Sequence, residues 1–217
     1  MKAPEPSAAP SLIETMRIEV GGGMPLLEGH LQRLRRSSLT LGHVWPGAAP
    51  IRERLRGEVA ELDTDRAWRV RMLLAPNGSV SVTHGPLMAL PDPLPVMIAA
   101  QPRDGGAEMW LQHKTTHRPW YQETAAWLDA HPEIFDVLYW NEDGQMCEGS
   151  RTNLYMQTAD GCWLTPPLKM GALPGVQRAA LLEAGQVVEA SITREEFLRA
   201  GRWRISNALR GWRDAVQ

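Results

Sequence analysis

Two segments of alternating polar and apolar residues, joined by Pro76-Asn77-Gly78, constrain the fold of this chain most strongly. Residues 67–76 and 78–85 have the two-residue period of half-buried β-strands, and the Pro-Asn-Gly step between them is a turn signal. We therefore expect a hairpin. Residues 12–20 add a third strand, because their alternation and β-branched side chains stop at three consecutive glycines.

Helical patterns lie between these strands. Residues 24–42 predict a helix that ends near Gly42, since four leucines recur at helical or near-helical spacing: Leu27, Leu31, Leu34 and Leu41. A second helix fits residues 49–62, and a further strand fits residues 93–102. The mixture predicts a small α+β domain at residues 12–105, after a Pro/Ala/Ser-rich leader, residues 1–11, that we expect to be disordered.

The rest of the chain, residues 106–217, predicts a second and larger domain of the same class. Pro119 suits the first turn of a helix, and Thr193 with Glu196 forms a capping-box pattern. The expected elements are a helix at 118–133, three strand-like runs within 135–167, a helix at 173–185, a strand at 186–192, a short helix at 193–201 and a final strand running into a turn at 202–216.

Composition narrows the classes of function. The hydrophobic content of 43% is enough for a core, and 217 residues fit one large domain or two small ones packed together. A net charge of −2 supports no nucleic-acid partner. Cys147 and Cys162 are the only cysteines, so neither a disulfide framework nor a cysteine-based zinc site is expected, and we expect no metal. No signal peptide or membrane-length apolar stretch occurs, so we expect a cytoplasmic protein with no membrane partner.

Lys114 is the first candidate for chemistry. It stands in the stretch HKTTHRPWYQ, residues 113–122, among histidines, an arginine and two aromatic rings. Burial of a lysine lowers its proton affinity, and a neutral amine can form a Schiff base. An ordinary solvated lysine at a domain joint is the commoner alternative.

Glu148 and three anion-binding patterns are the other candidates. Glu148, in the run EGSRTNL, could pair with Arg151 at a turn or hold a protonated pyridine nitrogen. The Pro-Gly step before the helix at 173–185 could bind a phosphate at the helix N-terminus, or could be ordinary turn chemistry. Ser206 and Asn207 offer donors at the end of a strand, and Arg33 alone reads as a surface arginine.

Taken together and in order, these pieces resemble one family. Lys114, Glu148 34 residues later, and the runs HLQRL, EGSRTNL, LTPP and LPGVQR are similar to those of the fold-type IV pyridoxal-phosphate enzymes. This family contains branched-chain aminotransferases, D-amino-acid aminotransferases and 4-amino-4-deoxychorismate lyases. The resemblance runs from about residue 13 to the end and is strongest with the lyase branch, through LIETMR, HKTTHR and NALRGWRDAV.

The resemblance implies a role for each candidate residue around pyridoxal 5'-phosphate. Lys114 would form the Schiff base and shuttle protons, and Glu148 would pair with the pyridine nitrogen. Arg71 would face the substrate carboxylate. The phosphate would be bound by Arg33, by the backbone of Val176 and Gln177, and by the turn at Ser206, Asn207 and Ala208.

The implied fold is a two-domain α+β fold of the D-amino-acid aminotransferase type, in which we expect a shortened N-terminal segment. The implied activity is release of pyruvate and 4-aminobenzoate from 4-amino-4-deoxychorismate, a step of folate synthesis, by a homodimer. A class IV aminotransferase acting on branched-chain or D-amino acids is the alternative, although no arginine–histidine trap follows Arg71. A non-catalytic relative that binds the cofactor is the second alternative.

Overall fold

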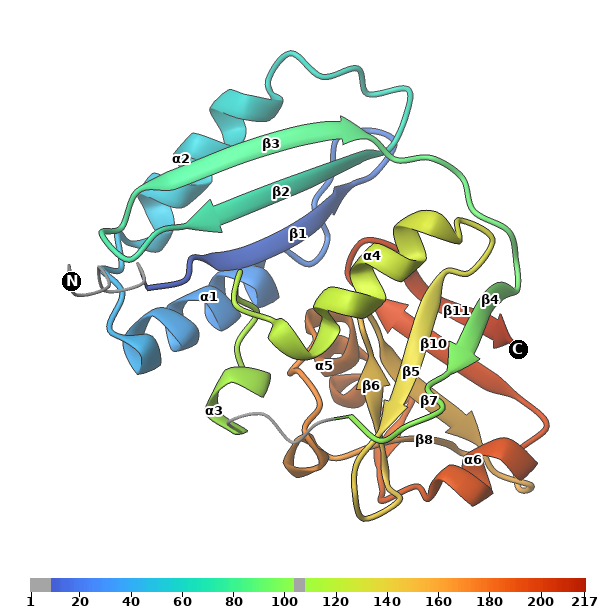
Figure 1. Ribbon diagram of the computed structural model, residues 1–217. Coiled ribbons are helices and arrows are strands. Elements are labelled where there is room, and N and C mark those ends of the chain that lie inside the picture. The colour runs from blue at the N-terminus through green and yellow to red at the C-terminus, as the bar shows by residue number, and fades with distance from the viewer. Residues whose placement is uncertain (1–8, 104–107) are drawn as a thin grey trace, which may run out of the picture.

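The computed structural model describes residues 9–103 and 108–217, and in it the described chain forms two β-sheets (Figure 1). The small sheet has the order β1-β2-β3, all antiparallel. Its strands are β1 (Leu12–Ile18), β2 (Trp68–Leu74) and β3 (Val80–Pro86). The hairpin expected around Pro76-Asn77-Gly78 is confirmed, since β2 and β3 pair along their whole length.

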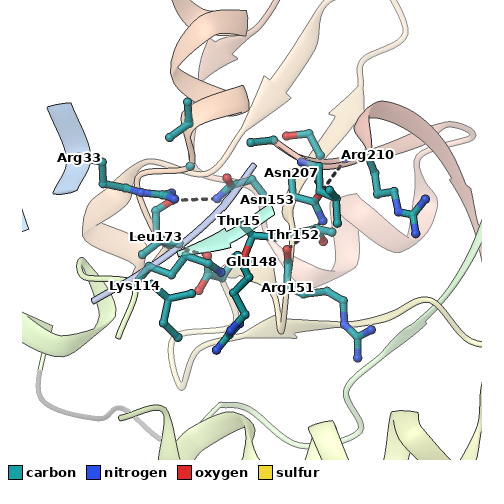
Figure 2. A pocket seen from close by; sticks show the side chains of 18 of the residues that line it. Thr15, Arg33, Lys114, Glu148, Arg151, Thr152, Asn153, Leu173, Asn207 and Arg210 are labelled. Atoms are coloured by element: carbon teal, nitrogen blue, oxygen red, sulfur yellow. Dashed lines mark hydrogen bonds between the residues drawn. The ribbon is translucent and has the colours of Figure 1, made fainter. Parts of the chain in front are cut away.

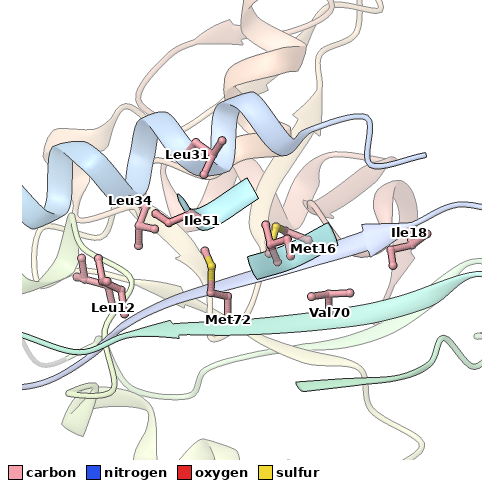
Figure 3. Packing of buried hydrophobic residues seen from close by; sticks show 10 residues of the cluster. Leu12, Met16, Ile18, Leu31, Leu34, Ile51, Val70 and Met72 are labelled. Atoms are coloured by element: carbon pink, nitrogen blue, oxygen red, sulfur yellow. The ribbon is translucent and has the colours of Figure 1, made fainter. Parts of the chain in front are cut away.

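Two helices cover one face of the small sheet. They are α1 (Leu27–Leu41) and α2 (Ala48–Val59), and Gly42 ends α1 in the left-handed conformation. Alternate residues of β1 and β2, such as Met16 and Met72, point at Leu34 of α1 and Ile51 of α2 (Figure 3). The residues between them therefore face the other side of the sheet, away from this core.

The large sheet is mixed and has the order β6-β5-β4-β11-β10-β7-β8-β9. Its strands are β4 (Leu94–Ile98), β5 (Asp136–Trp140), β6 (Met146–Gly149), β7 (Asn153–Gln157), β8 (Trp163–Thr165), β9 (Val188–Glu189), β10 (Trp203–Asn207) and β11 (Gly211–Val216). The accompanying helical elements are α3 (Glu108–Leu111), η1 (Pro119–Tyr121), α4 (Gln122–Ala130), η2 (Leu168–Met170), α5 (Val176–Glu183) and α6 (Arg194–Arg199). The capping box expected at Thr193 and Glu196 is present at the start of α6.

Three sequence expectations about the strands need correction. The strand expected at 93–102 was grouped with the small domain, but β4 pairs in parallel with both β5 and β11 and so belongs to the large sheet. The final strand at 202–216 is a hairpin, β10 and β11, because Asn207 Oδ1 accepts the backbone N–H groups of Leu209 and Arg210 and closes a turn. One of the three runs within 135–167 is split into β6 and β7.

The expected leader, residues 1–11, lies mostly outside the described residues, as does the boundary expected near residue 105. No helix within residues 9–103 and 108–217 combines the length and the apolar character needed to cross a membrane.

Candidate active site

A cavity of about 510 Å³ is lined by residues of both sheets and of the segments that connect them (Figure 2). The small sheet contributes the face that α1 and α2 leave free, with Ile13 and Thr15 of β1 and Arg69 and Arg71 of β2. The large sheet contributes the ends of β6 and β10. The opposite walls of the cavity therefore come from parts of the chain far apart in sequence.

Lys114 lies on the cavity wall in the loop between α3 and η1, and its backbone is tied to β1. The N–H of Ile13 donates to the Lys114 carbonyl at 2.7 Å, and the N–H of Thr116 donates to the carbonyl of Ser11 at 2.9 Å. The buried ring of His113 contacts the Ser37 hydroxyl of α1 at 2.8 Å. These contacts tie the segment around Lys114 to β1 and α1.

The pKa of the Lys114 amine lies near neutral pH. Burial lowers its pKa to about 7, and the positive charges of Arg118 and Arg33 act in the same direction. A substantial share of the amine is therefore unprotonated at neutral pH and can act as a nucleophile or base.

Glu148 lines the same cavity and is almost fully buried at the end of β6. Its carboxylate accepts a hydrogen bond from the Tyr121 hydroxyl at 3.0 Å and one from the Leu173 N–H at 2.8 Å. It does not pair with Arg151; the nearest cation is Arg118, at 3.9 Å. Burial raises the pKa of Glu148, while Arg118 and the hydrogen bonds oppose that shift.

The turn after Glu148 is held by a second buried carboxylate. Asp136 of β5 accepts hydrogen bonds from Ser150 and Thr152, each at 2.6 Å. A Cβ atom on Gly149 would come within 2.2 Å of the Asp136 carboxylate, so only glycine fits between them. These contacts break the strand between β6 and β7 and fix where Glu148 points.

Arg33 of α1 also lines the cavity, and it is held by Glu14 of β1. The Arg33 Nε donates to Glu14 at 2.9 Å, a second guanidinium nitrogen also donates to it, and His30 Nδ1 contacts the same carboxylate at 2.6 Å. Burial by itself would raise the pKa of Glu14, but the charge of Arg33 and these hydrogen bonds lower it to about 2. Arg33 is therefore a buried, ionised and fixed cation, not a surface arginine.

The N-terminus of α5 lies beside Arg33. A guanidinium nitrogen of Arg33 is 3.4 Å from the Pro174 carbonyl, and a Cβ on Gly29 of α1 would come within 2.6 Å of Val176. Val176 lines the cavity, whereas Gln177 is not among its lining residues. The first N–H groups of a helix have no partner within it, so this end of α5 offers donors beside the Arg33 cation.

The turn between β10 and β11 completes this wall. Ser206, Asn207 and Ala208 all line the cavity. The Ser206 hydroxyl is 2.7 Å from that of Tyr155, and burial raises the pKa of Tyr155, which keeps it protonated. Because Tyr155 can donate to Ser206, the Ser206 proton is available for an anion, while the Asn207 amide oxygen is used within its own turn.

The structure thus places all the expected site residues on the wall of one cavity except Gln177, which follows the lining residue Val176. Sequence reasoning missed Tyr121, which donates to Glu148, and Arg103, which donates to the Tyr121 oxygen at 3.1 Å. It also missed Asn153, whose amide donates to the Leu173 carbonyl at 2.9 Å. Tyr121 stands inside the HKTTHRPWYQ run and Asn153 inside the EGSRTNL run, but neither run indicates what these side chains contact, and Arg103 stands in neither.

Known proteins resemble this chain in sequence or in fold. The family model described as amino-transferase class IV matches residues 11–217. A Schizosaccharomyces pombe protein named "Putative aminodeoxychorismate lyase" is 36% identical over 170 residues, which cover 77% of this chain and 72% of that protein. The structure of a "Putative amino-acid aminotransferase" from Mesorhizobium loti is 32% identical, covers 96% of this chain and 99% of that chain, and has a TM-score of 0.84.

A structure of a "Putative 4-amino-4-deoxychorismate lyase" from Legionella pneumophila, at 20% identity and a TM-score of 0.78, shares the fold over 94% of this chain and 81% of that chain. The fold is that of the class IV aminotransferases, a family of pyridoxal-phosphate-dependent enzymes. The chain belongs to the class IV aminotransferase family, which confirms the resemblance seen in the sequence.

Proposed function

We propose that this protein is a pyridoxal-phosphate-dependent 4-amino-4-deoxychorismate lyase, which forms 4-aminobenzoate and pyruvate for folate synthesis. The observation that carries the proposal is the pairing of Lys114, whose pKa is about 7, with buried Glu148 on one cavity. The choice of the lyase within the family is supported by the 36% identity to the fission-yeast relative.

The residues of the cavity fit the cofactor. Pyridoxal phosphate needs an unprotonated amine, an anion for its ring nitrogen and donors for its phosphate. Lys114 supplies the first. Glu148 accepts two hydrogen bonds, which leaves acceptor capacity for a third donor. Arg33, the start of α5 and the Ser206 hydroxyl supply the donors, and about 510 Å³ is within the range of small-molecule sites.

We assign the cofactor contacts accordingly. Lys114 would form the covalent link and Glu148 would pair with the pyridine nitrogen. The phosphate would be bound by Arg33, by the backbone of Val176 and Gln177, and by the turn at Ser206, Asn207 and Ala208. Gln177 is assigned through its backbone N–H alone, and the residue is not among those that line the cavity. Arg71 faces a substrate carboxylate. When bound, the cofactor supplies an electron sink for the bond broken next to the substrate amine.

A residue of this chain accepts the proton that the reaction removes from the substrate. The C–H bond at the amine-bearing ring carbon breaks, and Nζ of Lys114, freed from its covalent link when the substrate amine takes its place, accepts the proton. Its pKa of about 7 keeps much of the free amine neutral. The C–O bond to the enolpyruvyl group breaks next, the ring becomes aromatic, and the departing enolpyruvate takes up one proton to become pyruvate. The atoms of the substrate equal those of the two products, so no second reactant is needed.

An aminotransferase is the second candidate, because the Mesorhizobium loti structure matches 99% of its own chain at 32% identity. One assay separates the two. The protein loaded with pyridoxal phosphate and mixed with aminodeoxychorismate alone should release pyruvate and 4-aminobenzoate in equal amounts over many turnovers. Absence of pyruvate, together with amino-group exchange between an amino acid and a keto acid, would replace the lyase by the aminotransferase.

We also propose that the working form is a homodimer in the cytoplasm. Support comes from apolar and aromatic side chains beside the Lys114 loop: Met109 is 51% exposed, and the His117 ring lies between Trp110 and Trp120, with ring centroids 5.3 and 6.2 Å away. Aromatic residues and methionine are enriched at protein interfaces.

A further inference from the structure

Four arginines lie near one another in the fold, and three of them line the cavity. Arg17 of β1 lies directly opposite Arg69 of β2, and Arg71 lies two residues further along β2. Strand alternation places all three on the face of the small sheet that its own helices do not cover. Arg69 and Arg71 line the cavity together with Arg210, which comes from the turn between β10 and β11.

Arg210 brings its charge from the other sheet. Its backbone N–H is fixed by the Asn207 side chain at 2.8 Å, and one of its guanidinium nitrogens donates to the Met88 carbonyl. Figure 2 places Arg33 at one side of the cavity and Arg210 at the other, so the two cations define separate ends.

No acidic group balances these charges within the part of the chain that the structure describes. Among the described residues, none of the four arginines has a carboxylate within 4.0 Å, although ten other arginines do. Of the acidic residues in the described part of the chain, Glu148 alone lines the cavity, and Arg118 is its nearest cation there. The Nε of Arg17 is buried without a hydrogen-bond partner.

Such an arrangement is costly in the unliganded protein. Like charges directly opposite each other on paired strands destabilise a sheet. Burial lowers the pKa values of Arg71 and Arg210, and neighbouring arginines, Arg69 in both cases, lower them further. An anion bound among these side chains would remove the repulsion and satisfy their donors.

We propose that Arg69 and Arg210 form a second carboxylate subsite beside Arg71, which makes a substrate with two carboxylates the preferred class. One bidentate arginine is enough for the single carboxylate of an amino acid. The proposed lyase substrate carries a ring carboxylate and an ether-linked enolpyruvyl carboxylate. The inference therefore rests on the proposed function for the identity of the substrate, but the subsite itself can be tested without turnover.

The test uses two stable aromatic probes that differ by one carboxylate. 3-(Carboxymethoxy)benzoate has a ring carboxylate and an ether-linked carboxylate, whereas 3-methoxybenzoate has only the first. Titration calorimetry on the cofactor-loaded protein should show the dicarboxylate binding about 10-fold or more tightly. Arg69→Gln and Arg210→Gln should each weaken the dicarboxylate by about 10-fold to about 100-fold and leave the monocarboxylate nearly unchanged.

Arg66→Gln is the matched control. Arg66 is an exposed arginine near Arg69 that pairs with Asp63 and Asp65, and its loss should change neither affinity. Equal binding of both probes by the unchanged protein would overturn the proposal. So would an unchanged dicarboxylate affinity in both variants, or variants whose only defect is loss of a dimer, since the arginines would then pair with a second copy of the chain.

The binding test of the carboxylate subsite can succeed or fail independently of the lyase assay. If no pyruvate forms but the dicarboxylate preference depends on Arg69 and Arg210, the subsite stands and the proposed reaction falls. If pyruvate forms while both variants keep the KM of the unchanged protein for aminodeoxychorismate, the reaction stands and the subsite falls.

Discussion

Replacement of Glu14 by glutamine tests how the small sheet holds the proposed phosphate-binding arginine. Glu14 is 1% exposed and lies between His30 and Arg33, both also buried. A glutamine keeps the size of the side chain but removes the negative charge, so Arg33 is left buried without an ion-pair partner. We therefore expect a large loss of stability from a nearly isosteric change.

Two arguments give the size of the stability loss expected in Glu14→Gln. The fall in the pKa of Glu14 from 4.5 to about 2 corresponds to about 3–4 kcal/mol of stability, at about 1.4 kcal/mol per pH unit. Breaking a buried ion pair by removing one partner costs about 3–5 kcal/mol. The free energy of unfolding at pH 7 should therefore fall by about 3–4 kcal/mol in Glu14→Gln.

The sign of the pH dependence is also determined. Because the pKa of Glu14 is lowered on folding, its contribution is fully present above its ordinary value of 4.5 and is lost as the pH falls toward about 2. The difference in stability between the unchanged protein and Glu14→Gln should therefore shrink across that window.

Urea unfolding followed by tryptophan fluorescence measures both effects. Glu28→Gln is the control, because Glu28 forms an exposed pair with Arg52 and exposed pairs contribute about 0–1 kcal/mol. If Glu14→Gln were no less stable than Glu28→Gln at pH 7, the argument that Glu14 neutralises and fixes Arg33 would be refuted.

Three further predictions concern the cavity and the assembly. Borohydride reduction with pyridoxal phosphate should label Lys114 and not Lys169, the other lysine within the described residues. The labelling rate should rise from about pH 6 to about pH 8, because the Lys114 amine loses its proton near pH 7. A label on Lys169 or a labelling rate that does not change with pH would contradict this. Glu148→Gln should keep the label on Lys114 but lose about 30-fold or more in turnover, because the protonated pyridine nitrogen of the cofactor would lack its partner. Unchanged kinetics would make Glu148 a turn residue only. Light scattering should report a dimer at micromolar concentration, and an active monomer would refute the homodimer.

Local patterns predicted most of the elements but not all of their partners. The β2–β3 hairpin could be found because its turn and both strands are adjacent in sequence. The placement of β4 could not, since its partners β5 and β11 lie far along the chain and its own apolar run is compatible with either sheet. The break between β6 and β7 depends on the Asp136 carboxylate, which reaches it from another strand.

Residues of the candidate site also divide into those that the sequence could predict and those that only the fold could reveal. Lys114, Glu148 and Arg33 were predicted because they stand in runs that resemble a known family. Tyr121 and Arg103 were not, because the hydrogen bonds from Arg103 to Tyr121 and from Tyr121 to Glu148 form only once η1, β6 and the loops around them have packed.

By itself the amino-acid sequence determined the α+β class, the order of most elements and the side chains available for chemistry, because these follow from residue spacing and residue type. Only the tertiary structure decided which of these side chains lose water and which meet. Burial moves the pKa of Lys114 to about 7 and leaves Arg69, Arg71 and Arg210 around one cavity without an acidic partner among the described residues. Desolvation and charge proximity depend on distances across the fold, and no local pattern encodes them.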